Sequence, residues 1–528
     1  MSRLQSSEKK FLYLIISGLL VGLFLNLNLR PLIADEGIRG VVAQELELNE
    51  NLIVCTINNE PYYNKPPLYN WLIIVSANIV GEYNEFSLRL PMTLSLILSG
   101  FIIFFTLKNE LGERIATISG LAYITSARIL FYDSYLGLID IFYSLTVYIS
   151  FWVIYYFGKK EKYWHLFAIS YFLTAIGVLM KGLPSFAFQG ITLLTYFIYQ
   201  KKLAKLFSVQ HIVGFIFLAI PLGLFFYSYS FYGSLENYFV KLWTESSSRT
   251  VAEKSVLESV KHLFLFPFEN VIYAILPWGL LFPLFWVKNV RTLIKKTPVL
   301  MTFFYFSCSN IIVYWLSPET RPRYLFMIYA MLIPLLIFAY ENVRKDHLIK
   351  MTLNKVFLII SLVIIISPIS LFFVDQNALK FIPYVYYVSI SVIGIVCCIY
   401  LYFKSSISKL IVFLGVLMFI KISFSGVITP YRNLTELEDQ FKLEVLKAIK
   451  VSDGKPLQIL KGTPMGRENT FYIEAHRREI LKRHYDNPKP GIHYIVDQNQ
   501  LEEYDLKPLS KFRMRWEHRT SYIAELKE

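Results

Sequence analysis

Residues 11–29 read FLYLIISGLLVGLFLNLNL, a run that contains no charged side chain. A helix of about 20 apolar residues is long enough to cross the roughly 30 Å hydrocarbon core of a bilayer. Lys9 and Lys10 precede the run as in a signal peptide, but no small-residue cleavage site follows, so we expect this helix to stay in the membrane. Counting it, we predict thirteen membrane-spanning helices, at residues 11–29, 89–107, 115–131, 137–157, 164–180, 183–200, 211–231, 270–287, 298–316, 324–340, 353–374, 382–403 and 408–427.

Composition supports a membrane protein. The chain has 528 residues, of which 55% are hydrophobic and 17% are charged, more apolar surface than soluble cores can hide. The net charge of +14 could suit nucleic acid. Its placement instead follows the positive-inside rule, with cations such as Lys159, Lys160 and Lys162 gathered in alternate loops. We therefore expect contacts with membrane lipids, no nucleic-acid partner, and a cytoplasmic N-terminus.

The chain divides into two predicted domains, a transmembrane domain over residues 1–427 and a small domain over residues 428–528. An odd number of crossings places the second domain outside the membrane. Its short apolar runs, at 457–460, 470–473 and 493–496, alternate with charged stretches and predict an α/β or α+β unit. Four scattered cysteines indicate neither a disulfide framework nor a thiolate metal site.

The first outside segment, residues 30–88, carries an acidic pair directly after the first helix. Asp35 and Glu36 could cap the following helix, or face a substrate at the membrane surface. Residues 38–49 alternate apolar and polar side chains in the manner of an amphipathic helix lying along the membrane. The apolar residues 68–80 are too few to span comfortably and predict a second surface helix.

Several further ionisable residues lie on the same predicted side. The prolines of Asn64-Lys65-Pro66-Pro67 fix the backbone around a lysine that suits a phosphate, or that extends towards anionic lipid. Asp140 lies in an apolar run, where a charge costs about 2.5–3.5 kcal/mol at the helix centre, so it lines a cavity or pairs with a buried cation. Asp133 flanks the start of the same helix. The outside cations Lys181, Arg321 and Arg323 suggest an anionic ligand.

These residues occur in an order that resembles one family. The matching motifs are Asp35-Glu36, Lys65-Pro66-Pro67-Leu68 with Trp71, Arg89-Leu90-Pro91, Asp140, Lys181-Gly182 and Arg323-Tyr324. Over roughly residues 10–340 the chain resembles the polyprenyl-phosphate-dependent GT-C glycosyltransferases, closest to the bacterial branch of lipid A aminoarabinose transferases and relatives of protein O-mannosyltransferases. The resemblance implies an all-α membrane fold, a polyprenyl-phosphate-linked sugar donor, and inversion at the anomeric carbon. It also implies a lipid, glycan or protein acceptor, and a bacterial inner-membrane location with the C-terminal domain in the periplasm.

The resemblance also implies roles for individual residues. Asp35 matches the principal catalytic acid, with Glu36 beside it, and Asp140 matches a second acidic position. Lys65 and Arg323 match the positions that hold the donor phosphate, and Lys181 and Arg321 join them as weaker candidates. Asp133, Tyr63 and Tyr324 are secondary candidates.

Three questions stay open at this point. Asp35 is a general base if the acceptor is a hydroxyl, and orients the acceptor or sugar if the acceptor is a lipid phosphate. Relatives often carry an acid where this chain has Asn64, so we predict no metal site and no cofactor, although a divalent metal is left open. The alternative functions are a transporter or flippase of lipid-linked sugars and a non-catalytic scaffold.

Overall fold

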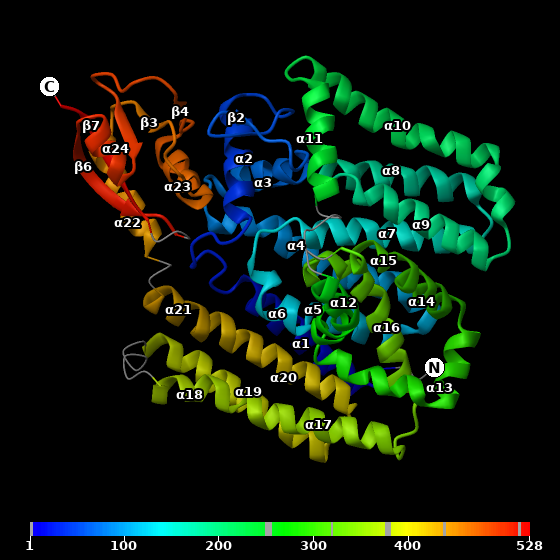
Figure 1. The fold of residues 1–528 in the computed structure, drawn as a ribbon. Helices are drawn as coiled ribbons and strands as arrows, with labels where there is room; N and C mark the ends of the chain where they lie inside the picture. Colours follow the sequence, from blue (N-terminus) through cyan, green and yellow to red (C-terminus); the bar gives the residue numbers. More distant parts are fainter. Residues whose placement is uncertain are drawn as a thin grey trace.

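The computed structural model describes residues 4–248, 256–317, 320–374, 382–436, 440–515 and 519–527. Figure 1 shows a large helical body with a small mixed sheet at one end. In this view helices α17–α20 run along one side of the body and helices α8–α10 lie on the other.

Every predicted spanning run contains helical residues, but the count of thirteen is not confirmed. Among the described residues, eight helices are long and apolar enough to cross a membrane, or up to ten if two bent pairs each form one span. Helix α9 (Pro184–Tyr199) is one predicted span that is not counted, because it has only 16 residues. The remaining bounds are α1 (Ser6–Phe24), α4 (Glu85–Leu111), α5 (Glu113–Ile124), α6 (Ala127–Phe131), α7 (Asp140–Lys159), α8 (Tyr163–Lys181), α10 (Val209–Ser230), α11 (Leu235–Ser248), α12 (Val256–Phe266), η3 (Pro267–Tyr273), η4 (Trp278–Trp286), α13 (Lys288–Lys296), α14 (Pro298–Asn310), α15 (Ile312–Trp315), α16 (Phe326–Asn342), α17 (Leu348–Ile364), α18 (Ile366–Val374), α19 (Ile382–Lys404), α20 (Lys409–Ser423), η7 (Phe424–Ile428) and α21 (Thr429–Thr435).

Helix packing gathers particular helix ends. Helices α7 and α8 pack as neighbours that run in opposite directions, so α7 begins beside the point where α8 ends. Helix α16 is apolar on all sides and almost wholly buried, which is expected of a helix in the centre of a bundle. The short helix η5 (Pro322–Leu325) directly precedes α16 and packs against α7.

The first outside segment forms two helices and a small hairpin. They are α2 (Glu36–Leu48), β1 (Thr56–Ile57), β2 (Glu60–Pro61) and α3 (Leu68–Val80). The predicted amphipathic helix is present as α2, and most of its polar residues are buried. Arg39, Gln44 and Glu45 are as buried as the apolar face. Arg39 donates to Asn70 of α3, and Gln44 donates to Phe471 O of helix α23, which belongs to the C-terminal domain and packs against α2.

The C-terminal domain is the predicted α/β unit. Its helices are α22 (Phe441–Ala448), α23 (Arg467–Arg477) and α24 (Gln498–Glu503). The strands β3 (Leu457–Leu460), β4 (Arg483–His484), β5 (His493–Val496), β6 (Leu506–Arg513) and β7 (Thr520–Leu526) form one sheet in the order β4-β3-β5-β7-β6. Strand β3 is parallel to its two neighbours, whereas β7 is antiparallel to β5 and β6. The apolar runs at 457–460 and 493–496 are strands, and the run at 470–473 belongs to α23.

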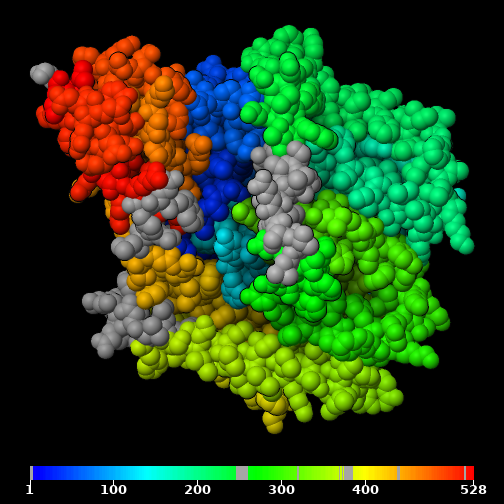
Figure 2. Space-filling model, in the orientation of Figure 1, coloured from blue at the N-terminus to red at the C-terminus, as the bar shows by residue number. Residues whose placement is uncertain are grey.

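This domain lies directly against the first outside segment. Figure 1 places α23, in orange, beside the blue helix α2, and Figure 2 shows the two regions in contact on the molecular surface.

Candidate active site

Three buried charges meet where α7 begins and α8 ends. Asp140 is the first residue of α7, Lys181 is the last residue of α8, and Arg323 lies in η5. Lys181 Nζ lies 2.5 Å from Asp140 Oδ1, and Arg323 Nε lies 3.3 Å from Asp140 Oδ2. Their side chains are 7%, 6% and 5% exposed, so one carboxylate compensates two cations away from water.

Asp35 extends this network to an accessible surface. Arg323 Nη2 donates to Asp35 Oδ2 at 2.6 Å, and the Asp35 side chain is 50% exposed. Asp35 Oδ1 accepts no hydrogen bond within the described part of the chain. The arrangement therefore presents one carboxylate oxygen outward from a rigid, buried support.

The remaining phosphate candidates lie at different distances from this network. Lys65 is half-buried and interacts electrostatically with Asp140, and the buried Pro66 and Pro67 follow it. Arg321 is exposed, and no ion pair involving it occurs among the described residues. The structure therefore brings Lys65 to the network and leaves Arg321 outside it.

Of the two tyrosines named from the sequence, Tyr324 borders the network and Tyr63 packs in an aromatic cluster beside α11. Lys181 Nζ lies 4.3 Å from the centre of the Tyr324 ring, a distance suited to a cation–π contact. Tyr63 packs edge-on against Tyr238 of α11, with the ring centres 6.2 Å apart. Asp133 belongs to a separate pair, because its Oδ2 accepts from Arg128 Nε at 2.7 Å.

Glu36 is enclosed by a structural network of its own. Arg89 donates to both of its carboxylate oxygens, from Nε at 2.8 Å and from Nη2 at 3.0 Å, and both side chains are fully buried. The backbone N–H groups of Ile33 and Gly137 donate to the same oxygens at 2.9 and 2.7 Å. Each carboxylate oxygen of Glu36 thus accepts two hydrogen bonds, and the side chain is fully buried. Glu36 therefore fixes the chain around Asp35 and presents no oxygen to a substrate.

Sequence reasoning gave no role to several residues around this site. Arg39 donates to the Tyr62 hydroxyl at 2.7 Å, and burial raises the pKa of Tyr62 above its usual value. Tyr69 is fully buried near Asp140, and burial followed by the negative charges of Glu36 and Asp140 raises the pKa of its phenol. Its hydroxyl has no hydrogen-bond partner among the described residues.

Lys421 of α20 is a further buried cation that sequence reasoning missed. Its amine donates to Leu130 O at 2.9 Å and to Ser134 Oγ at 3.0 Å. The sequence does carry a signal for Lys421, because it is a lysine inside the apolar run 408–427. Its partners in the structure are uncharged oxygens, which the sequence does not reveal.

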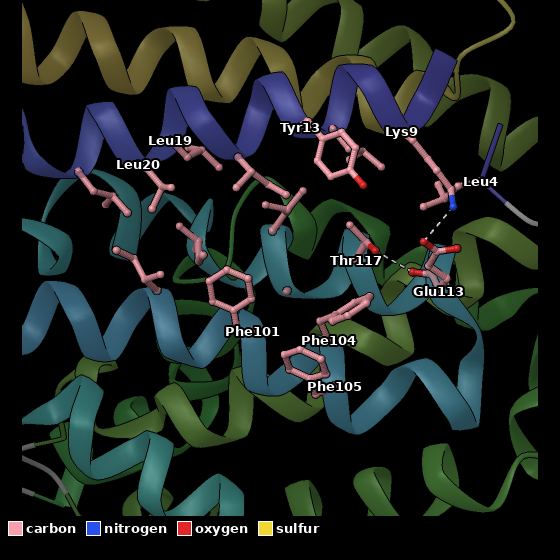
Figure 3. A pocket seen from close by; sticks show the side chains of 18 residues that line it. Leu4, Lys9, Tyr13, Leu19, Leu20, Phe101, Phe104, Phe105, Glu113 and Thr117 are labelled. Carbon is pink, nitrogen blue, oxygen red and sulfur yellow. Dashed lines mark hydrogen bonds and ion pairs between the residues drawn. The ribbon is translucent and has the colours of Figure 1, made fainter. Parts of the chain in front are cut away.

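No group of three or more histidine, cysteine, aspartate or glutamate side chains suited to a metal occurs within the described ranges. A cavity of about 250 Å³ lies away from the charge network, between α1, α4 and α5 (Figure 3). Its wall is apolar except at one end, where Lys9 pairs with Glu113 at 3.2 Å. The site is therefore defined by the charge network and not by this cavity.

Comparison with known proteins shows similarity to transferases that use sugars linked to lipid phosphates. The dolichyl-phosphate-mannose-protein mannosyltransferase family model matches residues 64–226. An undecaprenyl phosphate-alpha-4-amino-4-deoxy-L-arabinose arabinosyl transferase from Shewanella sediminis (strain HAW-EB3) is 24% identical over 266 residues, which are 49% of this chain and 47% of that protein. The match therefore spans about half the length of that relative.

The fold is similar over almost the whole chain to two crystal structures of ArnT from Cupriavidus metallidurans. The structure bound to undecaprenyl phosphate gives a TM-score of 0.73 at 16% identity, and the apo structure gives 0.70 at 15% identity. Each comparison covers 98% of this chain and 98% of the other. The chain is therefore a multi-pass membrane protein with an ArnT-like fold, and its residues 64–226 are similar to the mannosyltransferase family.

Proposed function

We propose that the protein transfers a sugar from a polyprenyl-phosphate-linked donor to a lipid, glycan or protein acceptor at the membrane surface where Asp35 lies. The observation that carries this proposal is the half-exposed Asp35 held by the buried Arg323, Asp140 and Lys181. A reacting carboxylate on such a support needs little reorganisation during the reaction. We place the N-terminus in the cytoplasm and the C-terminal domain in the periplasm of a bacterial inner membrane, from the loop charges.

The donor phosphate binds to Lys65, Arg323 and Lys181. Arg323 uses one terminal nitrogen for Asp35, and its planar fork carries further N–H groups that suit phosphate oxygens. Lys65 supplies a positive charge beside the network from a backbone fixed by two prolines. Asp140 prevents Lys181 and Arg323 from repelling each other before the donor arrives.

The transfer step follows from these placements. The acceptor attacks the anomeric carbon, the bond from that carbon to the phosphate oxygen breaks, and its electron pair leaves with the polyprenyl phosphate. Attack opposite the departing phosphate inverts the anomeric configuration. Lys65, Arg323 and Lys181 stabilise the developing phosphate charge through charge-assisted hydrogen bonds. With a hydroxyl acceptor, Asp35 Oδ1 takes the acceptor proton.

The placement of the charges does not favour the transporter alternative. Asp140 begins α7, Lys181 ends α8, and Lys65 and Arg323 precede α3 and α16. All four therefore lie at helix ends, whereas transporter sites typically lie near the bilayer midplane, between broken helices.

Reconstitution in vesicles separates these functions. Purified protein is supplied with a polyprenyl-phosphate-linked sugar and an acceptor fraction, and release of free polyprenyl phosphate is measured. We expect release by the unaltered protein and at least about 100-fold slower release by Arg323→Gln, which removes the phosphate-facing cation. Movement of the intact sugar lipid across the membrane without release would contradict the proposal.

A further inference from the structure

The loop that carries Asp35 is held from outside the membrane domain. Residues 25–35 connect α1 to α2, and the backbone of Leu32 is bound on both sides by the C-terminal domain. Leu32 N–H donates to the Tyr472 hydroxyl at 2.8 Å, and Arg515 Nη1 donates to Leu32 O at 2.5 Å. All three residues are buried, so these bonds are shielded from competing water.

Tyr472 joins three parts of the molecule at one oxygen. While accepting from Leu32, its hydroxyl donates to Glu85 Oε1 at 2.8 Å. Glu85 is the first residue of membrane helix α4, and it also accepts from Lys442 Nζ of the C-terminal domain at 2.6 Å. Burial raises the pKa of Tyr472 well above its usual value, which keeps the hydroxyl protonated for this donation.

The same loop is fixed from the membrane side by Arg89. Its Nη1 donates to the carbonyl oxygens of Leu27 and Arg30 at 2.8 and 3.0 Å, and its Nη2 donates to Pro31 O at 3.2 Å. Glu436, at the start of the C-terminal segment, forms an ion pair with Arg30. The loop is thus held by hydrogen bonds from both the membrane domain and the C-terminal domain before it reaches Asp35.

The residue before Asp35 has a strained backbone, which requires fixed surroundings. Ala34 has a φ of +56°, in the left-handed region that costs a non-glycine residue roughly 1 kcal/mol or more. A strained residue persists only where its surroundings determine it. Leu32 is bound by the C-terminal domain two residues before Ala34, and Glu36 is bound by Arg89 two residues after it.

We propose that the C-terminal domain is a working part of the active site, in which Tyr472 and Arg515 position the Asp35 carboxylate through the backbone of Leu32. This inference rests on the proposed function, because it assigns the domain to the reaction that Asp35 serves. Tyr472 and Arg515 are positioning residues. Their hydrogen bonds place them on Leu32 and Glu85: Tyr472 bonds to both, and Arg515 bonds to Leu32.

The test uses the full chain with two single variants and a matched control. Tyr472→Phe removes the hydroxyl and leaves the buried Leu32 N–H without its acceptor, and Arg515→Gln removes the second bond. The control is Tyr494→Phe, which also removes a buried tyrosine hydroxyl in the C-terminal domain, but one that accepts from Lys489 N at 2.9 Å, far along the chain from Leu32. Because a displacement of about 1 Å costs roughly 100-fold in rate, we expect Tyr472→Phe to lower kcat about 10- to 100-fold.

The expected signature is a fall in kcat with the KM for the donor changed less than about twofold, since the phosphate cations Lys181 and Arg323 belong to α8 and η5 of the transmembrane domain. Arg515→Gln should show the same split, and Tyr494→Phe should match the unaltered protein. Equal kcat values for Tyr472→Phe and Tyr494→Phe would overturn the inference, as would a change in KM alone. If Tyr472→Phe fails to fold, Arg515→Gln decides.

A double variant separates this inference from the proposed function. In an Asp35→Asn background, residual single-turnover transfer should be the same with Tyr472 or Phe at position 472, because the positioned carboxylate is gone. A further loss of the same size would show that Tyr472 acts through something other than Asp35. Full activity of Asp35→Asn itself would instead contradict the proposed function.

Discussion

Replacing Asp140 with asparagine tests whether the buried network is built as described. Asp140 compensates both Lys181 and Arg323, and its side chain is only 6% exposed. Removing one partner of a buried ion pair costs about 3–5 kcal/mol, because the other charge is left without compensation. Asparagine still accepts a hydrogen bond from Lys181, so we expect a loss near the lower limit, about 3 kcal/mol.

Unfolding in a detergent titration with SDS measures this loss. A loss of about 3 kcal/mol lowers the ratio of folded to unfolded protein by more than 100-fold. Asp346→Asn is the matched control, because Asp346 pairs with Arg344 on the surface and should leave the midpoint unchanged. The double variant Asp140→Asn with Lys181→Met should recover part of the loss, since it also removes one uncompensated cation. A midpoint for Asp140→Asn equal to that of Asp346→Asn would refute the reasoning.

Three further changes test other parts of the account. Glu36→Gln should cost about 3–5 kcal/mol in the same titration, because it breaks the buried two-point contact with Arg89, and an unaltered midpoint would contradict the structural role of Glu36. Arg323→Lys should raise the donor KM at least about tenfold in transfer assays, because a lysine lacks the fork that binds two partners, whereas kinetics like those of the unaltered protein would exclude Arg323 from the phosphate site. Burial and then the Glu45 charge raise the pKa of Glu474 from 4.5 to about 10, so the folded protein binds more protons than the unfolded chain between these values, and stability should fall as the pH rises from 4.5 to 10. Glu474→Gln should flatten that slope in unfolding titrations, and an unchanged slope would show that this carboxyl does not cause it.

Hydrophobic length predicts much of the fold, because it acts locally along the chain. The run at 89–107 is the clearest example, since it lies wholly within α4. The run at 11–29 does less well, because α1 ends at Phe24 and is not among the helices long and apolar enough to cross a membrane. The number of spans was less predictable, because α9 is short and the 353–374 run divides into α17 and α18. The buried polar face of α2 was unpredictable for a different reason, because α23 covers it from more than 400 residues away along the chain.

Part of the site could also be predicted, because a charge in an apolar run is conspicuous. Asp140 and Lys181 stand out in this way, and the structure joins them to Arg323. The different fates of the neighbours Asp35 and Glu36 could not be read from the sequence, since they depend on distant partners. Arg323 holds Asp35 at an accessible surface, whereas Arg89 encloses Glu36.

Single-turnover transfer by Asp35→Asn and Asp346→Asn tests the central claim most directly. Both variants replace one aspartate carboxylate with an amide, but Asp35 lies on the charge network and Asp346 lies on the surface beside Arg344. With a hydroxyl acceptor and a polyprenyl-phosphate-linked sugar, we expect Asp35→Asn to be slower by about 10²- to 10⁴-fold, the usual contribution of a general base. Asp346→Asn should retain the rate of the unaltered protein. Equal rates for the two variants would contradict the assignment of Asp35 as the reacting carboxylate.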